Sequence, residues 1–322
     1  MQKINFLNEP KLSDQEHNKD QDERRLSLIK EIEKFLNGHS LFQEKIINIH
    51  FFQEGVSSLV SKIETGDDTS ILKIQIRPTG AKGEGLFLRT WEANEISVPR
   101  IIEDGYIGEH YYILMENINE SFGKKDNVDA NFFFEIGKTL NKMHKVSAEG
   151  FGRLKDTGVA EYQDFESWIT EDKQINNQKK YILDNNILPE NEYGYINDAI
   201  KYLVDKIGNN SSVYCHNDFS PKNIFLTKPL TVFDPVPSFN NPYIDLGRSI
   251  LKIVSEGFDK KEYIKSFLRG YFEYEKCNSE LLQSSLLFNA YTMIPNLNKT
   301  GQIEKIEQIK KFLSEITLFN NF

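Results

Sequence analysis

One stretch, from Val213 to Asp245, constrains the fold of this chain more than any other. Its first apolar run ends at Cys215, a polar loop follows, and a second apolar run begins at Ile224. We therefore expect a loop that is held at both ends by buried strands. A third short run, Thr231 to Phe233, ends on the carboxylate of Asp234, and the proline that follows prevents further regular strand pairing.

Three polar side chains of this stretch have the chemistry of a magnesium site. Asp218 and Asn223 lie in the loop, and Asp234 follows the third run. Carboxylate and amide oxygens suit Mg²⁺, a hard cation that proteins usually hold with one or two carboxylates and substrate phosphates. The spacing His-x-Asp-x-x-x-x-Asn, which starts at His216, is that of a kinase catalytic loop. A chance match is the competing explanation, but the flanking strands and the downstream acid favour function.

The same stretch resembles the aminoglycoside phosphotransferase and choline kinase-like family of small-molecule kinases. The resemblance lies in three places, which are His216-Asn217-Asp218-Phe219-Ser220-Pro221-Lys222-Asn223, Asp234, and Asp245-Leu246-Gly247. It extends from about Ile46 to Glu256 and is specific only between Val213 and Asp245. It implies an α+β, protein-kinase-like bilobal fold, with an N-terminal β-sheet lobe and a larger helical C-terminal lobe.

Two positions depart from the family pattern. Asn217 stands where the family usually has the glycine of His-Gly-Asp. Pro235 follows Asp234, where the family usually has an aromatic residue and then an acid or glycine. The Asp-Pro pair is similar to the streptomycin kinase-like branch of the family. Both departures are also compatible with a pseudokinase that binds nucleotide without turnover.

Length and composition limit the class of protein. A chain of 322 residues is long for one core and suits two lobes that share a cleft. The formal net charge of −9 argues against a nucleic-acid partner and tolerates a cationic ligand. No apolar run approaches the ~18 residues that span a bilayer, and the N-terminus is too polar for a secretory signal. The two cysteines, Cys215 and Cys277, form no disulfide or zinc pattern, so we expect a cytoplasmic protein without a membrane partner.

The first part of the chain reads as a β-rich lobe with helices. The polar segment from Met1 to Asp22 is expected to be loose, and the apolar spacing from Glu23 to Leu36 predicts a helix with Gly38 at its C-terminal cap. Glu84 to Asn94 is helical in composition. Five strands are expected, at Ile46 to Phe52, Leu59 to Glu64, Ser70 to Arg77, Ile101 to Asp104 and Tyr111 to Met115.

The loop between the first two expected strands has the composition of a phosphate-binding loop. Gly55 would let the backbone come close to a phosphate, and Ser57 and Ser58 could donate hydrogen bonds to its oxygens. An ordinary hairpin turn explains the same residues equally well.

Strand alternation places Lys73 beside Ile71, on the face opposite Leu72. A solvated lysine is the more common fate of such a residue. The family resemblance implies instead that Lys73 contacts nucleotide phosphates and pairs with a helix glutamate. Counting back from Val98-Pro99-Arg100 makes Glu84 that partner, with Glu92 as the alternative. The family resemblance also implies a hinge near Asn117, where main-chain atoms of Glu116 and Ile118 would contact the purine edge of the nucleotide.

The second part of the chain is predominantly helical in pattern. Helices are expected at Asn131 to His144, Glu190 to Ile207 and repeatedly beyond Asp245. His144 is expected to be a core or capping residue. Phe151-Gly152-Arg153-Leu154 resembles a loop that follows this helix in the family. Glu161 to Pro189 is expected to be helical and to line the acceptor side.

These features lead to one hypothesis about the reaction. The resemblance implies two lobes, residues 1–117 and 118–322, and Mg²⁺-dependent transfer of the γ-phosphate of ATP or GTP to a hydroxyl of a small acceptor. Asp218 would orient the hydroxyl and accept its proton, and His216, the second candidate catalytic residue, would support the loop through hydrogen bonds. Asp245 would anchor the same loop. Asn223 and Asp234 would bind the metal.

The acceptor is expected to be cationic, such as an aminoglycoside, which would make the protein an antibiotic-resistance enzyme. Acids are frequent after the Phe151 segment, and no basic residue interrupts Glu161 to Asp172. They are Glu161, Asp164, Glu166, Glu171 and Asp172. A solvated helix face explains them as well. The other hypotheses are a metabolic kinase for choline, homoserine or a sugar, and the pseudokinase; a protein kinase is disfavoured because Asp-Phe-Gly and Ala-Pro-Glu segments are missing from the sequence.

Overall fold

The protein is represented by a computed structural model, which describes residues 3–12, 19–43, 45–53, 57–66, 68–76, 82–154, 158–185, 187, 190–208 and 212–315. The chain divides into two compact units. The first contains Met1–Glu92 and Val98–Asn119, and the second contains Ala93–Ser97 and Glu120–Phe322. The division therefore falls two residues beyond residue 117, and a short segment after the second helix belongs to the second unit.

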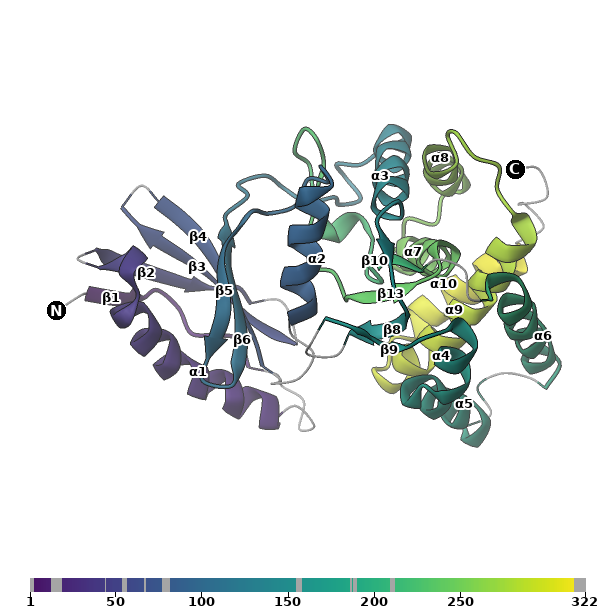
Figure 1. The fold of residues 1–322 in the computed structure, drawn as a ribbon, viewed down its shortest axis with the longest axis horizontal. Coiled ribbons are helices and arrows are strands. Elements are labelled where there is room, and N and C mark those ends of the chain that lie inside the picture. Colours follow the sequence, from purple (N-terminus) through teal and green to yellow (C-terminus); the bar gives the residue numbers. More distant parts are fainter. Residues whose placement is uncertain are drawn as a thin grey trace. The chain divides into compact units, whose positions relative to one another are not determined.

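The first unit is built on a six-stranded sheet with the order β1-β2-β3-β4-β6-β5 (Figure 1). Consecutive strands from β2 to β4 pair antiparallel, and so do β4 with β6 and β5 with β6. The elements are β1 (Lys3–Phe6), α1 (Lys19–Gly38), the 3-10 helix η2 (Ser40–Phe42), β2 (Ile46–Phe51), β3 (Ser58–Thr65), β4 (Asp68–Gln75), α2 (Lys82–Ala93), β5 (Ile101–Ile107) and β6 (His110–Glu116).

The two faces of this sheet have different partners. On one face, Leu72 and Ile74 of β4 join a buried cluster with Leu28, Ile32 and other α1 residues. The alternation of side chains along a strand sends Lys73 to the opposite face, where Ile71 packs in a smaller cluster formed with residues of β5 and β6. Lys73 and Ile71 therefore lie on the same face of the sheet, opposite the face that packs against α1.

The N-terminal segment is more ordered than the sequence predicts. Residues Lys3–Phe6 form β1, which pairs in parallel with β2 at the edge of the sheet. Asn8 continues this contact, because its side chain accepts from the N–H of Phe51 and donates to the carbonyl of Phe51. The expectation of a loose N-terminus was wrong here because an open sheet edge offers backbone partners even to a polar segment.

The second unit contains most of the helices and a second sheet. Its five-stranded sheet has the order β7-β10-β13-β8-β9, and β11 with β12 forms a separate hairpin. The elements are α3 (Ala130–Met143), β7 (Ser147–Ala148), β8 (Phe151–Leu154), β9 (Ala160–Tyr162), α4 (Phe165–Glu171), α5 (Lys173–Asp184), α6 (Glu190–Ile207), β10 (Ser212–Cys215), the 3-10 helix η3 (Pro221–Asn223), β11 (Ile224–Phe225), β12 (Thr231–Val232), β13 (Ser238–Asn240), α7 (Pro242–Ser255), α8 (Lys261–Tyr271), α9 (Ser279–Lys299) and α10 (Ile303–Ser314).

The sheet of the second unit corrects one sequence-based expectation. Phe151–Leu154 is strand β8 and not a loop, and it pairs with β13 and β9. Its residues alternate between buried and exposed only in part, because Phe151 and Gly152 are both buried. A four-residue strand of this kind shows no clear period in the sequence, and its pairing partners lie far along the chain.

Two helices of the second unit cross closely through glycines. A Cβ atom at Gly137 of α3 would lie 2.1 Å from the carbonyl oxygen of Phe267 in α8, so only glycine allows this approach. The close crossing brings His144, the C-cap of α3, to Tyr271 at the end of α8, with 2.7 Å between His144 Nδ1 and the hydroxyl oxygen. No helix among the residues that the structure describes is long and apolar enough to cross a membrane.

Candidate active site

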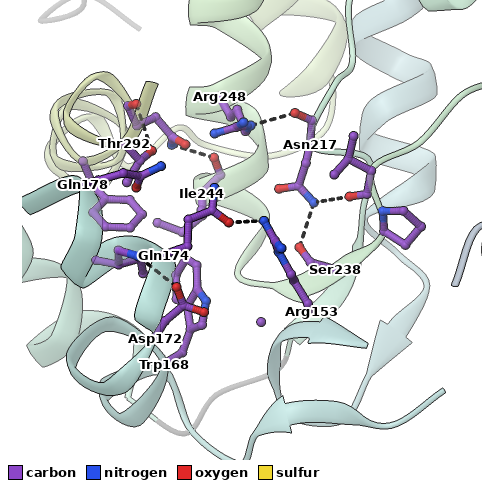
Figure 2. Close-up of a pocket in the computed structure, with 16 residues that line it drawn as sticks. Arg153, Trp168, Asp172, Gln174, Gln178, Asn217, Ser238, Ile244, Arg248 and Thr292 are labelled. Carbon is purple, nitrogen blue, oxygen red and sulfur yellow. Dashed lines mark hydrogen bonds between the residues drawn. The ribbon is translucent and has the colours of Figure 1, made fainter. Parts of the chain in front are cut away.

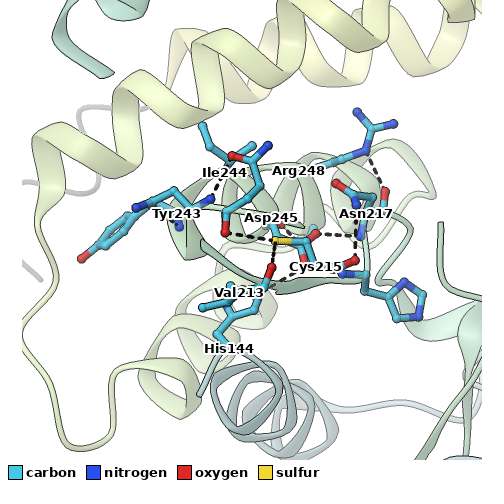
Figure 3. A network of polar contacts seen from close by, with 12 residues as sticks. His144, Val213, Cys215, Asn217, Tyr243, Ile244, Asp245 and Arg248 are labelled. Atoms are coloured by element: carbon cyan, nitrogen blue, oxygen red, sulfur yellow. Dashed lines mark hydrogen bonds and ion pairs between the residues drawn. The ribbon is translucent and has the colours of Figure 1, made fainter. Parts of the chain in front are cut away.

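The loop after β10 is anchored by one buried carboxylate (Figure 3). Asp245, in the first turn of α7, is 0% exposed and accepts hydrogen bonds from the backbone N–H groups of His216 and Asn217, at 2.7 and 2.8 Å. Nε2 of His144 lies 3.1 Å from the same carboxylate. Burial raises the pKa of Asp245, but the hydrogen bond and charge of His144 and the other contacts outweigh burial, so that the pKa lies below its usual range. Asp245 therefore holds the start of the loop as an anion.

His216 is completely buried and positions the loop from within. Its Nε2 lies 3.0 Å from the carbonyl oxygen of Phe233, and its Nδ1 lies 3.3 Å from the backbone nitrogen of Asp218. A carbonyl only accepts and a backbone N–H only donates, so Nε2 carries the proton and Nδ1 accepts. Burial lowers the pKa of His216, which agrees with a neutral imidazole. We therefore assign His216 a positioning role, since a side chain with no exposed surface cannot reach a substrate.

Asn217 has a structural reason to replace the usual glycine. Its φ of 58° lies in the left-handed region, which asparagine tolerates better than most residues. Its side-chain amide donates to the carbonyl of Val236 at 2.8 Å and to the hydroxyl of Ser238 at 2.7 Å, and its own carbonyl accepts from Nε of Arg248 at 2.7 Å. Asn217 thus keeps the backbone conformation that glycine permits and adds hydrogen bonds to Val236 and to Ser238, the first residue of β13.

Asp218 lies among charged groups that keep it ionised. Lys252 of α7 pairs with one carboxylate oxygen of Asp218, and Nζ of Lys222 lies 3.6 Å from the other. Burial acts to raise the pKa of Asp218, but the charges of Lys252 and Lys222 outweigh it, so the pKa lies below its usual range. Lys222 also pairs with Glu256 at 3.0 Å.

The hairpin β11–β12 brings Asn223 and Asp234 to one end. Asn223 comes directly before β11 and Phe233 directly after β12, and the N–H of Phe233 donates to the carbonyl of Asn223 at 3.1 Å. Asn223 donates through Nδ2 to the backbone carbonyl of Asp218 at 2.8 Å, so its amide oxygen is the atom that can face a cation. Asp234 is exposed, with a φ of 56°. Backbone in this region is strained for a residue other than glycine, and such residues cluster at functional sites.

The oxygen atoms available at this end of the hairpin fit a magnesium ion. An exposed carboxylate from Asp234 and an amide oxygen from Asn223 match the preference of Mg²⁺ for one or two protein oxygens together with phosphate and water. Both side chains offer oxygen ligands and neither offers a sulfur or an imidazole nitrogen, which agrees with a hard cation.

A second cluster of ligand-type atoms does not fit a metal ion. Atoms of His144, Cys215 and Asp245 lie within 4.8 Å of one another, and all three residues are buried. The carboxylate and the imidazole already serve as partners of the loop and of Tyr271. Burial raises the pKa of the Cys215 thiol well above its usual value, whereas a metal ligand must be a thiolate. This cluster is a structural support of the loop.

Lys73 and Glu84 form a buried ion pair in the first unit. Nζ of Lys73 lies 2.7 Å from Oε1 of Glu84, and the two residues are 8% and 3% exposed. Of the two glutamates considered from the sequence, Glu84 and not Glu92 is the partner. Ile71, two residues earlier on β4, lies opposite Met115 in the sheet register and packs in the same small cluster. A charged pair and an apolar patch therefore share one face of the sheet.

The other residues expected to contact the nucleotide differ in their exposure and in their backbone partners. Gly55 lies outside the described residues. Ser57 is exposed and directly precedes β3, whereas Ser58 is buried within that strand. The N–H of Glu116 donates to the carbonyl of Arg100 at 3.0 Å and so already has a partner within the protein. Ile118 follows β6 in irregular structure, where its N–H is not part of a strand.

A cavity of about 110 Å³ lies beside the catalytic loop (Figure 2). It borders Asn217, the residue before Asp218, and its wall includes Trp168, Asp172, Arg153 and Arg248. Of the five acids expected to attract a cation, only Asp172 lines this cavity. Asp164 and Asp172 are the N-caps of α4 and α5, and each side chain accepts from a backbone N–H of its own helix.

The fold and the family of the chain follow from comparison with known proteins. Residues 48–278, more than two thirds of the chain, match the model of the phosphotransferase enzyme family. The chain belongs to this family. It is an enzyme, a phosphotransferase with an alcohol group as acceptor. A search of curated proteins returns no match.

Solved structures show the same protein-kinase-like fold as this phosphotransferase. The crystal structure of aminoglycoside phosphotransferase APH(4)-Ia has a TM-score of 0.64 at 12% identity, over 91% of this chain and 100% of that one. A putative fructosamine-3-kinase from Haemophilus somnus 129PT has a TM-score of 0.60 at 15% identity, over 91% and 98%. Spectinomycin phosphotransferase APH(9)-Ia, in complex with ADP and spectinomycin, has a TM-score of 0.56 at 14% identity, over 86% and 95%.

Four charged residues of the phosphotransferase site were missed in the sequence. Arg248 and Lys252 follow Asp245 at i+3 and i+7, so all three lie on one face of α7. Most of α7 is buried and apolar, and two cations on its buried side are an anomaly that could have been noticed. Lys222 lies inside the loop motif itself. Arg153 gives no such signal, because an exposed arginine on a short strand is ordinary.

Proposed function

We propose that this phosphotransferase is a Mg²⁺-dependent small-molecule kinase, which transfers the γ-phosphate of a nucleoside triphosphate to a hydroxyl group. The observation that supports this most is the state of Asp218, an ionised carboxylate on a loop fixed by Asp245 and His216, with Asn223 beside it. A carboxylate of this kind can orient a hydroxyl and take its proton.

The proposed reaction assigns a role to residues of each unit. The acceptor oxygen forms a bond to the γ-phosphorus as the bond to the β,γ-bridging oxygen breaks, the hydroxyl proton goes to Asp218, and the nucleoside diphosphate leaves. Lys73, held by Glu84, would steady the phosphates. Asn223 and Asp234 would hold Mg²⁺, which supplies neutralisation of phosphate charge when it is bound.

A nucleotide donor is supported by relatives of similar fold. APH(4)-Ia has been crystallised in ternary complexes, one with ADP and hygromycin B and one with AMP-PNP and hygromycin B. In this chain, the face of the first sheet that carries Lys73 and Ile71 would receive the nucleotide, and the carbonyl of Glu116 and the N–H of Ile118 would meet the purine edge. Either ATP or GTP satisfies these contacts.

The acceptor is proposed to be a small molecule that carries an amine. Relatives of this fold are named for aminoglycosides, spectinomycin and fructosamine. In this chain Asp172 is 7% exposed, lines the cavity beside Asn217 and could bind an ammonium group. Aminoglycosides, choline and homoserine all carry such a group. A neutral sugar is the alternative without one.

A nucleotide-binding pseudokinase is the rival function, and two observations weaken the argument for it. Its support in the sequence was Asn217 in place of glycine and Pro235 after Asp234. Asn217 adopts the left-handed conformation and stabilises the loop, so its replacement of glycine explains no loss of activity. Pro235 is buried next to a strained Asp234, in a backbone shape compatible with a metal-binding site.

The proposal is tested by nucleotide binding and acceptor turnover with Mg²⁺ present and absent. Wild-type protein should release ADP or GDP in the presence of at least one hydroxyl acceptor from a panel of aminoglycosides, choline, homoserine and sugars. Asp234→Asn should abolish Mg²⁺-dependent nucleotide binding in calorimetry, because a neutral amide replaces a carboxylate poorly on a hard cation. Asp198→Asn, an exposed acid on α6, is the control.

Two outcomes would contradict the proposal. Tight Mg²⁺-dependent nucleotide binding without release in the presence of any acceptor would favour the pseudokinase. Unchanged metal-dependent binding in Asp234→Asn would remove that residue from the metal site.

A further inference from the structure

We infer that the acceptor also carries an acid group, and that Arg153 and Arg248 bind it, which makes the acceptor a small hydroxylated amino acid or a similar zwitterion. This inference rests on the proposed function, since it names the class of molecule that the kinase phosphorylates.

Two guanidinium groups reach the cavity from separate elements (Figure 2). Arg153 extends from β8, where it is paired with Ser238 of β13, and Arg248 extends from α7. Burial lowers the pKa of Arg248, Asp218 and Asp245 act to raise it, and Arg153 lowers it as a smaller cause. The two guanidinium groups place two positive charges at one cavity, and a lining of one sign of charge attracts a counter-ion.

Both arginines retain donors for a ligand. Among the described residues, Arg248 donates only through Nε, to the carbonyl of Asn217, and Arg153 only through one Nη, to the side chain of Gln174. A guanidinium has five N–H donors in a planar arrangement that matches the two oxygens of a carboxylate. The donors left over are therefore suited to an oxyanion.

Neighbouring acids already have cations of their own. Asp218 is balanced by Lys252 and Lys222, and Glu256 shares Lys222. Asp245, which also faces Arg248 electrostatically, uses its oxygens on backbone N–H groups and on His144. The carboxylate that lines the cavity is Asp172, and one of its oxygens accepts from the N–H of Ile175 at 2.9 Å. Arg153 has no carboxylate partner among the described residues, so an acid that joins both arginines would come with the ligand.

The size of the cavity agrees with a small zwitterion. A volume of about 110 Å³ lies below the range of about 300–1,000 Å³ for drug-sized ligands, so the cavity suits few heavy atoms. An ammonium group at Asp172 and a carboxylate at the arginine pair would orient such a molecule. Its hydroxyl would then extend past Asn217 toward Asp218.

Matched acceptors test the inference. L-homoserine and 3-amino-1-propanol share the hydroxyl and the amine, and only the first has a carboxylate; gluconate and sorbitol form a second pair. In coupled ADP-release assays, the acid of each pair should have a kcat/KM at least tenfold above its partner, mainly through KM. Arg153→Gln should lower this preference at least fivefold, mainly by raising the KM of the acid. Lys206→Gln, an exposed cation on α6, should change neither value.

Binding measurements keep the inference separate from turnover. Arg248→Lys is measured beside Arg153→Gln, because lysine keeps the positive charge. Arg248→Gln is avoided because it removes the charge together with the hydrogen bond to the carbonyl of Asn217. If no acceptor is turned over, the proposed function fails, but saturable binding of L-homoserine in preference to 3-amino-1-propanol, weakened by Arg153→Gln, would still support the anion subsite. Three outcomes would overturn the inference. The acid and the neutral member of a pair are used or bound equally, neither acid binds, or a polycationic aminoglycoside is turned over better than either acid.

Discussion

The catalytic loop and the cavity beside it are adjacent in the second unit but differ in how their polar groups are satisfied. In the loop, the side-chain amide nitrogens of Asn217 and Asn223 and Nδ1 of His216 meet protein partners at 2.7 to 3.3 Å. In the cavity, Arg248 and Arg153 make few contacts within the described chain and keep donors toward the open space.

This difference separates positioning from recognition. A loop that must hold a carboxylate in one place is stabilised by satisfied, buried hydrogen bonds, and loss of one partner leaves others unpaired. A cavity that binds and releases a ligand keeps hydrogen-bond donors without protein partners next to solvent, and this lowers stability. Variants in the loop should therefore change folding or turnover, and variants in the cavity should change binding alone.

The largest effect is expected from Asp218→Asn. An amide cannot take the hydroxyl proton, so turnover should fall by about 10²- to 10⁴-fold, while circular dichroism and nucleotide binding show an intact fold. Steady-state ADP release with the best acceptor measures the effect. Near-normal turnover would show that Asp218 is not the base.

Asp245→Asn should cost stability more than any cavity variant. Two backbone N–H groups and His144 lose an ionised partner, which should lower the free energy of unfolding by about 3 kcal/mol. Urea unfolding measures it, with Glu262→Gln in the first turn of α8 as the control.

The pH dependence of stability gives an independent check on Asp245. The pKa of Asp245 is lowered in the folded protein, so its stabilisation is complete above the unfolded value of about 3.9 and is lost as pH falls through the lower folded value. Wild type should lose this increment in acid, and Asp245→Asn should lack it. A constant stability difference between the two proteins from pH 6 to pH 2 would contradict the role of Asp245.

Asn217 tests the departure from the family pattern at smaller scale. Asn217→Ala removes the side-chain hydrogen bonds and keeps the strain of a positive φ, whereas Asn217→Gly removes the same bonds and relieves the strain. Alanine should therefore be less stable than glycine by about 1 kcal/mol. Equal stability of the two variants would mean that the conformation of this residue is not what the loop depends on.

The smallest effect on folding is expected in the cavity. Arg153 is exposed, and Arg153→Gln should change the free energy of unfolding by no more than about 0.5 kcal/mol, in contrast to Asp245→Asn. Chemical denaturation of both variants in one buffer makes the comparison. A loss comparable to that of Asp245→Asn would erase the distinction between loop and cavity.

Local patterns in the sequence were sufficient for the loop and for most elements. The sequence predicted a loop between two strands and an acid at the end of a third short run, and in the structure Asn223 precedes β11 and Asp234 follows its partner β12. The ion pair of Lys73 could be assigned to Glu84 only by adding a family resemblance to strand alternation, since two glutamates of one helix were candidates.

Other expectations depended on distant partners. The acids from Glu161 to Asp172 looked like a cation-binding wall, yet two of them cap helices and only Asp172 reaches the cavity. Sequence charge shows which groups are present but not which of them already have a backbone partner.

The sequence by itself therefore determined the chemistry of the centre, an acid, an amide and a second acid at kinase spacing, because those groups are held by neighbours along the chain. Only the tertiary structure decided what surrounds that centre. Arg153 and Arg248 are 95 positions apart in the numbering and meet at one cavity because β8 pairs with β13, and the chain passes from β13 directly into α7. Long-range pairing of this kind leaves no local period in the sequence, so the charged lining of a cavity is set by packing and cannot be read from spacing.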